Sequence, residues 1–303
     1  MVVTMGKKNK LRSLQSPRTG YIMMIPATIL LLLTQLYPFF YGLGMSFTNY
    51  NLLTIKKTRI IGLENYAKIL FEDPEFWHIF LFSLVYTLSI VIFSYIFGFL
   101  IALLLNKPMK GRGIFRAIIL IPWVISTAIM ASNWKWLLND EFGLVNGVLQ
   151  SLGVISKPIR FFATAGWARF SVCAIGVWRN LPFMAITLLA GLQGIPNELY
   201  EAAIVDGATK WQSFWKITIP YMRSTTLIST TLLFIWAFNG FENIYLLTDG
   251  GPVNSTMVVP IYAFKMAFNS SRMGYASALS ILLMVIMVIV SLVRMKLSKN
   301  QDI

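Results

Sequence analysis

The stretch Gly194–Tyr221, GIPNELYEAAIVDGATKWQSFWKITIPY, is a polar interruption between two long apolar segments. It predicts two short helices joined at a glycine, which we call the hairpin. Asn197 is expected to cap the first helix, because its side-chain oxygen can accept hydrogen bonds from the free N–H groups of a first turn. Gly207 is expected to end that helix, since glycine readily adopts the left-handed conformation found there. Thr209 and Gln212 have the spacing of a capping box and predict the start of the second helix.

The second helix of the hairpin has an aromatic face. Trp211, Phe214 and Trp215 are spaced at i, i+3 and i+4, so they share one side. Two interpretations follow. Either the hairpin docks into a groove of another protein, with these aromatic residues seating its second helix against membrane-spanning helices, or it lies at the membrane interface with the two tryptophans as anchors. The pattern alone does not choose between them.

The composition places the chain in a membrane. Of its 303 residues, 56% are hydrophobic and 13% are charged, and the mean hydropathy is +0.67. A net charge of +14 also occurs in nucleic-acid-binding proteins. Membrane proteins, however, collect Lys and Arg on their cytoplasmic side, so we expect no nucleic-acid partner. The single cysteine, Cys173, cannot form a disulfide within the chain, and the single histidine, His78, cannot build a histidine-based metal site.

The apolar segments predict an all-α integral membrane protein with six transmembrane helices. About 20 apolar residues span a bilayer, and the backbone must satisfy its own hydrogen bonds there, so each span is expected to be a helix. The first segment exceeds the apolar core of about 7–15 residues in a secretory signal, so it is expected to be retained. The expected spans are Tyr21–Phe47, 79–105, 117–138, 170–193, 225–247 and 275–293.

The distribution of basic residues predicts the orientation of these spans. Lys and Arg are more numerous in the termini and even-numbered loops than in the odd-numbered loops. The positive-inside rule therefore places both termini and the loop 194–223 in the cytoplasm. The chain divides into a basic cytoplasmic tail (1–20), a first helix with its outer loop (21–78), a core of five helices that includes the loop 194–223 (79–294), and a second cytoplasmic tail (295–303).

Motifs for catalysis or nucleotide binding are missing from the sequence. It contains no HExxH, GxSxG or phosphate-binding GxxxxGK[ST] pattern, and no Cys/His cluster. Ion-driven transporters usually need buried carboxylates or histidines. The ionisable residues within the apolar segments are only Lys135, Arg179 and Glu242. We therefore expect no enzyme and no metal site here, and any energy for transport is expected to enter through another subunit.

The hairpin resembles the EAA motif of ABC importer permeases. Glu201-Ala202-Ala203, three residues, Gly207, nine residues, Ile217, one residue and Ile219-Pro220 match E-A-A-x3-G-x9-I-x-L-P with one conservative departure, Ile219 for leucine. In that family the loop forms coupling helices that sit in a cleft of a cytoplasmic ATPase. The resemblance implies a type I ABC importer permease core whose ATPase contact is formed by Glu201, Ala202, Ala203, Asp206 and Gly207.

A second motif lies after the fifth span. It is Leu247-Thr248-Asp249-Gly250-Gly251-Pro252, followed by Asn254-Ser255-Thr256, and its composition predicts a turn. The motif resembles the carbohydrate-uptake branch of this family, the maltose and glycerol-phosphate type. The resemblance implies a permease in a bacterial or archaeal plasma membrane. Its implied partners are a second homologous permease, two ATPase subunits that bind ATP and Mg, an extracytoplasmic sugar-binding protein and membrane lipid. A permease for a non-sugar solute and an ion-coupled transporter are the alternatives.

Three segments offer candidate residues for a sugar site, which needs aromatic faces and polar groups near mid-membrane. By spacing, Trp123 and Thr127 share a helix face, as do Asn180 and Phe183, and Trp236 and Asn239; ordinary helix packing would explain the same spacings. The resemblance favours a binding site, because maltose-type permeases contact sugar at positions that match Trp123, Thr127, Asn180, Phe183, Leu233 and Trp236.

Arg179 departs from an ordinary membrane span. An arginine inside the bilayer needs a polar cavity or a partner. Arg179 is therefore a further candidate substrate contact, for an acidic sugar, and Glu242 is its candidate partner within the chain. Snorkelling towards the membrane surface is a third interpretation. We favour a structural or gating role over recognition of substrate charge.

Overall fold

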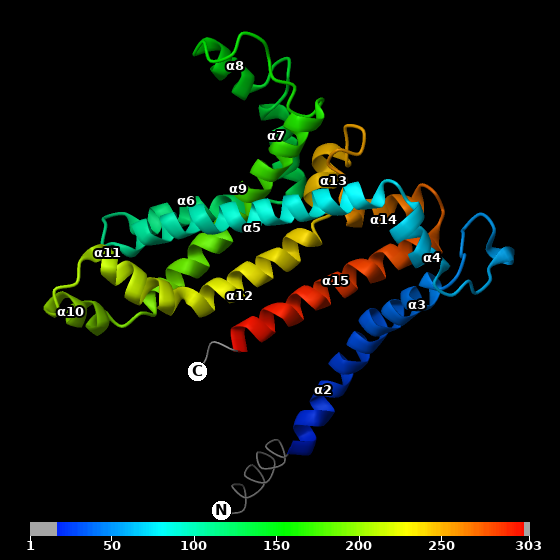
Figure 1. Ribbon diagram of the computed structural model, residues 1–303, viewed down its shortest axis with the longest axis horizontal. Helices are drawn as coiled ribbons and strands as arrows, with labels where there is room; N and C mark the ends of the chain where they lie inside the picture. The colour runs from blue at the N-terminus through cyan, green and yellow to red at the C-terminus, as the bar shows by residue number, and fades with distance from the viewer. Residues whose placement is uncertain (1–16, 300–303) are drawn as a thin grey trace, which may run out of the picture.

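The computed structural model describes residues 17–299, and in that range it is a bundle of helices without a β-sheet (Figure 1). The α-helices are α2 (Pro17–Leu31), α3 (Tyr37–Ser46), α4 (Glu64–Ala67), α5 (Phe76–Asn106), α6 (Arg112–Val124), α7 (Thr127–Leu137), α8 (Leu144–Ser151), α9 (Ala165–Gln193), α10 (Asn197–Val205), α11 (Lys210–Ser213), α12 (Ile219–Phe238), α13 (Glu242–Thr248), α14 (Val259–Phe268) and α15 (Met273–Lys299). Short π-helical turns η1 (Leu32–Leu36), η3 (Lys68–Glu72) and η4 (Phe214–Thr218) and the 3₁₀ turn η2 (Ile55–Lys57) extend them. The expected all-α fold is confirmed.

The long helices coincide with the expected spans. Within the described range, four segments are long and apolar enough to cross a membrane, namely Tyr21–Ser46, α5, α9 and Met273–Arg294 of α15. The bent pair α6 and α7 makes a fifth if it counts as one span. The remaining expected segment, 225–247, is divided between α12 and α13. Helix α2 begins at Pro17, inside the expected tail 1–20, whereas the apolar span itself begins at Tyr21. Residues 1–16 of that tail and residues 300–303 of the other tail lie outside the described range.

α12 is not among the four segments named above, and it carries several hydroxyl side chains. Thr230 Oγ1 donates to the carbonyl of Thr226 at 2.6 Å, and Thr231 Oγ1 donates to the carbonyl of Leu227 at 2.6 Å. Such bonds to the preceding turn satisfy a hydroxyl inside a bilayer without help from another helix. α12 therefore remains suitable for a membrane interior.

The expected continuous helix 225–247 is wrong beyond Phe238. The N–H of Gly240 donates to the carbonyl of Ala237 at 3.0 Å and closes a tight turn before α13 begins. A Cβ atom at position 240 would lie 2.8 Å from the Ala237 carbonyl oxygen. Glycine thus permits a turn that any larger residue would obstruct.

The expected helix 117–138 is also wrong as a single rod, because α6 and α7 meet at 95°. Pro122 lacks the N–H that would bond the preceding turn, which weakens the end of α6. Ile125 and Ser126 then adopt extended backbone angles, with ψ of 134° and 140°. The bend turns α7 away from the bundle, and α7 and α8 project from it (Figure 1).

The centre of the bundle is the pair α5 and α9, which pack together along much of their length. Small residues allow this close approach. A Cβ on Gly176 of α9 would lie 2.8 Å from Ile90 Cδ1, and one on Gly98 of α5 would lie 3.0 Å from Met184 Cγ. α12 packs against both helices, α6 packs against α9, and α14 packs against α15.

The first span is attached to this bundle at one end only. α3 packs against α15, whereas α2 diverges from it (Figure 1). The most apolar stretch of Tyr21–Ser46 has no buried residue. One side of α2 and the neighbouring part of α15 are therefore free of contacts within the described chain.

The segment that follows the first span is tied to α14 and α15 through one carboxylate. Tyr262 and Tyr275 each donate to Asp73 Oδ2 at 2.5 Å. Partial burial raises the pKa of Asp73, but the two tyrosine bonds and the N–H groups of Glu75 and Phe76 outweigh it and lower the pKa below its ordinary value of 3.8. The ionised carboxylate is thus the form that this contact favours.

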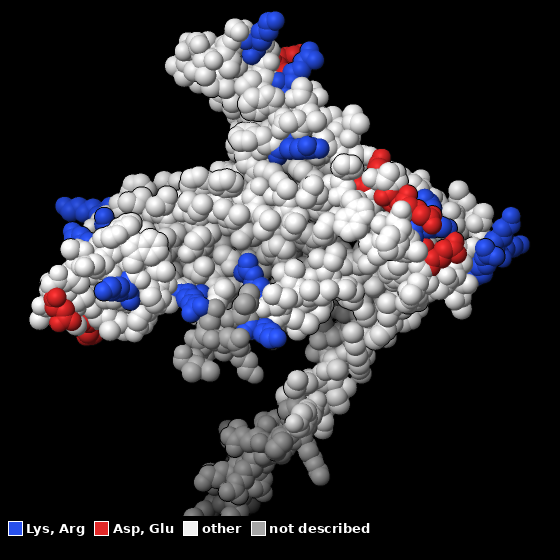
Figure 2. All heavy atoms as spheres, viewed as in Figure 1, with Lys and Arg blue, Asp and Glu red and all other residues white. Residues whose placement is uncertain are grey.

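Charged side chains gather towards the two ends of the bundle and on the α7–α8 projection, while the surface over the middle of α5 shows none (Figure 2). α10 and α11 lie at one end, and α4, α13 and the α14–α15 connection lie towards the other (Figure 1). An uncharged band between charged ends is the surface expected of helices that cross a bilayer.

Candidate functional site

The first helix of the hairpin begins where expected but is capped differently. α10 starts at Asn197 itself, so the cap position belongs to Pro196, which makes no side-chain cap hydrogen bond. The expectation that Asn197 caps this helix is wrong. A proline before the first turn fixes an extended backbone angle there, which sets the start of the helix without a side-chain bond.

Gly207 ends α10 as expected. Its φ of +76° lies in the left-handed region that favours glycine. The N–H of Ala208 donates to the carbonyl of Ala203 at 2.8 Å, and the N–H of Gly207 donates to the carbonyl of Ile204 at 3.0 Å. These two bonds form a Schellman motif, which satisfies the last carbonyl groups of the helix and reverses the chain.

The second helix also begins as expected. Thr209 N donates to Gln212 Oε1 at 2.7 Å, and Gln212 N donates to Thr209 Oγ1 at 3.3 Å, which is a complete capping box. α11 then continues through η4 into α12 without a break. Because both ends of the connection are fixed, α12 holds the hairpin in one orientation.

The three aromatic residues of the second helix divide between two environments. Phe214 is half-buried, and its ring lies 6.1 Å from that of Phe99 on α5. Trp211 stacks on Phe214 and Trp215 meets it edge-on, but both tryptophans are exposed. Of these three residues only Phe214 packs on the bundle, so the expectation that they seat the second helix is confirmed for Phe214 and wrong for the two tryptophans. The membrane-interface interpretation of the tryptophans stays a prediction.

The residues predicted to contact an ATPase are mostly exposed to solvent in the hairpin. Four of them are exposed and Ala203 is half-buried; the exposed ones are Glu201, Ala202, Asp206 and Gly207. The sequence reasoning missed their apolar neighbours, Ile204 and Val205, which are 70% and 87% exposed. Two adjacent apolar side chains beside the helix-ending glycine of a polar loop are the signal that identifies them.

A cluster of aromatic rings forms where α6, α9 and α12 approach one another. The ring of Phe183 lies 6.3 Å from that of Trp123 and 4.9 Å from that of Trp236. We call these three residues the aromatic cluster. The two tryptophans remain 49% and 47% exposed in the isolated chain, so they present open ring faces. Such faces suit the C–H surface of a sugar ring.

A polar chain of contacts lies beside this cluster. Arg179 Nη2 donates to Thr127 Oγ1 at 2.8 Å, and Thr127 Oγ1 donates to Glu242 Oε2 at 3.0 Å. We call these three residues the arginine link. Arg179 is one helical turn from Phe183, so the link and the aromatic cluster share a face of α9.

The link joins elements that are distant in sequence. Thr127 begins α7, Arg179 lies within α9 and Glu242 begins α13. The expected pairing of Arg179 with Glu242 is thus made through a hydroxyl rather than by direct contact. Trp123 lies on α6 and Thr127 on α7, and these helices meet at a bend, so the two residues do not share one helix face. The expectation based on their spacing is wrong. Both residues nevertheless lie in the same region, because α9 carries the contacts of each.

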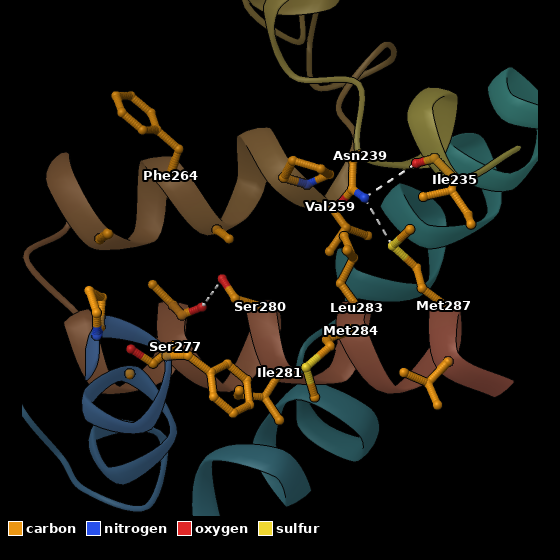
Figure 3. Close-up of a pocket in the computed structure, with 18 of the residues that line it drawn as sticks. Ile235, Asn239, Val259, Phe264, Ser277, Ser280, Ile281, Leu283, Met284 and Met287 are labelled. Carbon is orange, nitrogen blue, oxygen red and sulfur yellow. Dashed lines mark hydrogen bonds between the residues drawn. The ribbon is translucent and has the colours of Figure 1, made fainter. Parts of the chain in front are cut away.

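The remaining candidates have other environments. Asn180 is half-buried, and its Nδ2 donates to the carbonyl of Gly176 at 2.8 Å. Leu233 is fully buried in the core, so its side chain offers no surface to a solute in this conformation. Asn239 Nδ2 bonds the Ile235 carbonyl at 3.3 Å and lies 3.1 Å from Met287 Sδ, in a groove beside α15 (Figure 3). The fold therefore directs Asn239 towards α15 instead of Phe183.

The turn predicted after the fifth span is present. α13 ends at Thr248, and Asp249 and Gly250 both have positive φ angles, of 50° and 82°. The hydroxyl groups of Thr248 and Thr256 form a hydrogen bond of 2.7 Å, and Lys265 Nζ forms an ion pair with Asp249 Oδ2 at 3.0 Å. These contacts fix the turn against α14. Among residues 17–299 no group of His, Cys, Asp and Glu side chains has the arrangement of a metal site.

Comparison with known proteins places this arrangement in a family. The trehalose/maltose transport system permease protein MalF of Thermococcus litoralis is 35% identical over 93% of this chain and 94% of its own length. The sulfoquinovosyl glycerol transport system permease protein SmoG of Agrobacterium fabrum is 33% identical over 93% of the chain and 90% of its own length.

A solved structure has the same fold over most of its length. A bacterial alginate ABC transporter, in complex with a periplasmic protein that holds an alginate pentasaccharide, contains a chain of 26% identity that superposes with a TM-score of 0.81. The match covers 95% of the present chain and 96% of that one. Residues 94–300 match the family model described as binding-protein-dependent transport system inner membrane component, and the chain belongs to this family.

Proposed function

We propose that the chain is the membrane-spanning permease subunit of an ATP-driven, binding-protein-dependent importer of carbohydrate. The observation that carries the proposal is the hairpin. It is a rigid pair of helices, closed by a Schellman motif and a capping box, with Ile204 and Val205 exposed at its tip. Two exposed apolar side chains on a fixed turn suit docking into the groove of a partner.

The partner that fits the hairpin is a cytoplasmic ATPase. In this proposal two ATPase subunits bind ATP and Mg below the membrane, a second homologous permease completes the pathway, and an extracytoplasmic sugar-binding protein delivers the solute. Both termini lie in the cytoplasm with the hairpin. The chain itself performs no covalent chemistry. Closure of the ATPases would move the hairpin and, through α12, the helices that bear the aromatic cluster.

The aromatic cluster is the proposed sugar contact. Its two half-exposed tryptophans on α6 and α12 present ring faces, and the arginine link supplies polar atoms beside them. The named relatives support a carbohydrate, since they transport trehalose or maltose, sulfoquinovosyl glycerol and alginate. Alginate is an acidic polysaccharide, so the test below includes acidic as well as neutral sugars.

The experiment is uptake into proteoliposomes that contain the complete transporter with ATP inside and the binding protein outside. A panel of neutral and uronic-acid oligosaccharides is tested, and each solute is also offered to the permease alone under a proton or sodium gradient. We expect ATP- and binding-protein-dependent uptake of at least one oligosaccharide. Uptake by the permease alone, driven by the ion gradient, would contradict the proposal and establish a secondary transporter.

Arg179→Gln separates the two roles of the arginine link. We propose that Arg179 positions α7 and α13, so the variant should reduce uptake of neutral and acidic sugars alike. Loss of acidic sugar uptake with full retention of neutral sugar uptake would show that Arg179 recognises substrate charge instead. Arg179→Lys is the matched control, since it keeps the charge but loses the fork of donors.

A further inference from the structure

A long apolar groove runs between α12, α14 and α15 and is bordered by α3 (Figure 3). Its volume is about 890 Å³. Most of its lining side chains are apolar. Of the four polar ones, Ser280 Oγ donates to the Ala276 carbonyl at 3.0 Å and Asn239 Nδ2 contacts Met287 Sδ; the others are Ser277 and Ser291. A lining with so few polar groups favours hydrocarbon over a sugar.

The position of the groove follows from the divergence of the first span. α3 packs on α15, but α2 moves away, so the lower part of α15 has no helix beside it on that side (Figure 1). Along α15 the lining extends from Met273 to Leu292, which at 1.5 Å per residue is about 28 Å. That length approaches the hydrocarbon thickness of a bilayer, about 30 Å. The groove is therefore long enough to hold an extended acyl chain.

The guanidinium of Arg294 lies at the end of the groove that is nearer α10 and α11. Arg294 lies just beyond Leu292, and its Nη1 donates to Thr230 Oγ1 at 2.8 Å and to Thr231 Oγ1 at 3.0 Å. Both hydroxyls already donate to carbonyl groups of α12, so they hold the guanidinium as acceptors. Among residues 17–299, no carboxylate oxygen lies within 4.0 Å of Arg294.

We infer that this groove and Arg294 form a binding site for an anionic phospholipid of the cytoplasmic leaflet. The guanidinium, fixed by the two threonines, is placed to bind the phosphate, since arginine matches phosphate geometry with paired donors. The acyl chain lies along Met287 and Leu292 towards Met284. Basic side chains at the ends of spanning helices attract anionic headgroups. The site rests on the proposed orientation, in which α10 and α11 face the cytoplasm, but not on which solute the chain moves.

Photolabelling of the intact transporter tests this inference. The complex is placed in phosphatidylcholine nanodiscs with a small fraction of phosphatidylglycerol that has a diazirine in its acyl chain, and labelled residues are mapped by mass spectrometry. We expect labels on Met284, Met287 and Leu292. Arg294→Gln should lower this labelling about five-fold, the effect of one basic residue near a headgroup, and Arg294→Lys should retain most of it.

Two further variants sharpen the test. Ser291→Trp fills the groove without changing charge and should also abolish labelling, whereas Lys107→Gln removes a basic residue of the α5–α6 loop and should leave it unchanged. Equal labelling by a diazirine phosphatidylcholine, or no effect of Arg294→Gln, would overturn headgroup recognition. Absence of labelling together with disulfide trapping of Ser291→Cys to the second permease would show that a protein helix fills the groove.

Discussion

Replacing Gly207 with valine tests whether the hairpin transmits the energy of ATP hydrolysis. Gly207 has φ of +76°, and a Cβ there would meet no atom of the chain within 4 Å. The cost within the chain is therefore conformational and not steric. A left-handed residue other than glycine costs about 1–2 kcal/mol, and a branched side chain lies at the upper end. That energy lowers the ratio of intact to disrupted turn roughly 5–30-fold.

The assay measures sugar uptake and ATP hydrolysis in the same proteoliposomes, so that their ratio reports coupling. We expect Gly207→Val to lower uptake per ATP at least about tenfold. Gly62→Val is the matched control, because Gly62 also has positive φ, of 59°, with no atom within 4 Å of a Cβ, but lies far from the hairpin. Gly207→Asn, which tolerates the left-handed conformation, should recover much of the coupling. Unchanged uptake per ATP in Gly207→Val would refute the assignment of the hairpin.

Three further results are expected. Thr127→Val leaves Arg179 and Glu242 without their shared hydroxyl and should destabilise the folded chain by about 1–3 kcal/mol, measured by thermal unfolding in nanodiscs. Thr127→Ser keeps the hydroxyl and should retain the stability of the original chain. If the valine variant is equally stable, the link is not structural. Trp236→Ala should raise the KM for sugar about tenfold without changing basal ATP hydrolysis, as expected for loss of an aromatic contact of about 1.5 kcal/mol. Trp136→Ala removes an exposed tryptophan outside the cluster and should leave the KM unchanged. A normal KM in Trp236→Ala would exclude the aromatic cluster as the sugar contact. Because folding lowers the pKa of Asp73, the stability that its carboxylate contributes is present above the ordinary pKa of 3.8 and is lost as pH falls through the lower folded-state pKa. Asp73→Asn should remove this part of the acid sensitivity. Identical profiles of stability against pH for the two proteins would contradict this role of Asp73.

Local patterns in the sequence predict the hairpin well because its signals act over short distances. The capping box at Thr209 and the helix end at Gly207 depend on residues within one turn, and both are confirmed. The cap at Asn197 was wrong by one position because Pro196 takes the cap position. The matching motif then identified the family, although it gave no hint that Ile204 and Val205 would be so exposed.

The candidate sugar site was only partly predictable, because its geometry depends on bends. Residue spacing assumes straight helices, and the break at Ile125 invalidates the spacing of Trp123 and Thr127. Asn239 follows the last residue of α12 and turns towards Met287, which no periodicity in α12 indicates. The contact of Thr127 with Arg179 and Glu242 joins three segments of the chain, and only the packed structure can supply it.

The right-angle break before α7 gives this helix the mechanics of a lever. Its pivot is at Ile125 and Ser126, and Thr127 is the first residue beyond it. The far end, Leu137, lies about 15 Å away at 1.5 Å per residue, so a tilt of about ten degrees would sweep that end by roughly 2.6 Å. The same tilt would barely displace the Thr127 hydroxyl. A load on the α8 projection would therefore act first on the contacts along α7, at buried Met130 and at the Trp134–Trp178 ring pair, while the bond between Thr127 and Arg179 is kept.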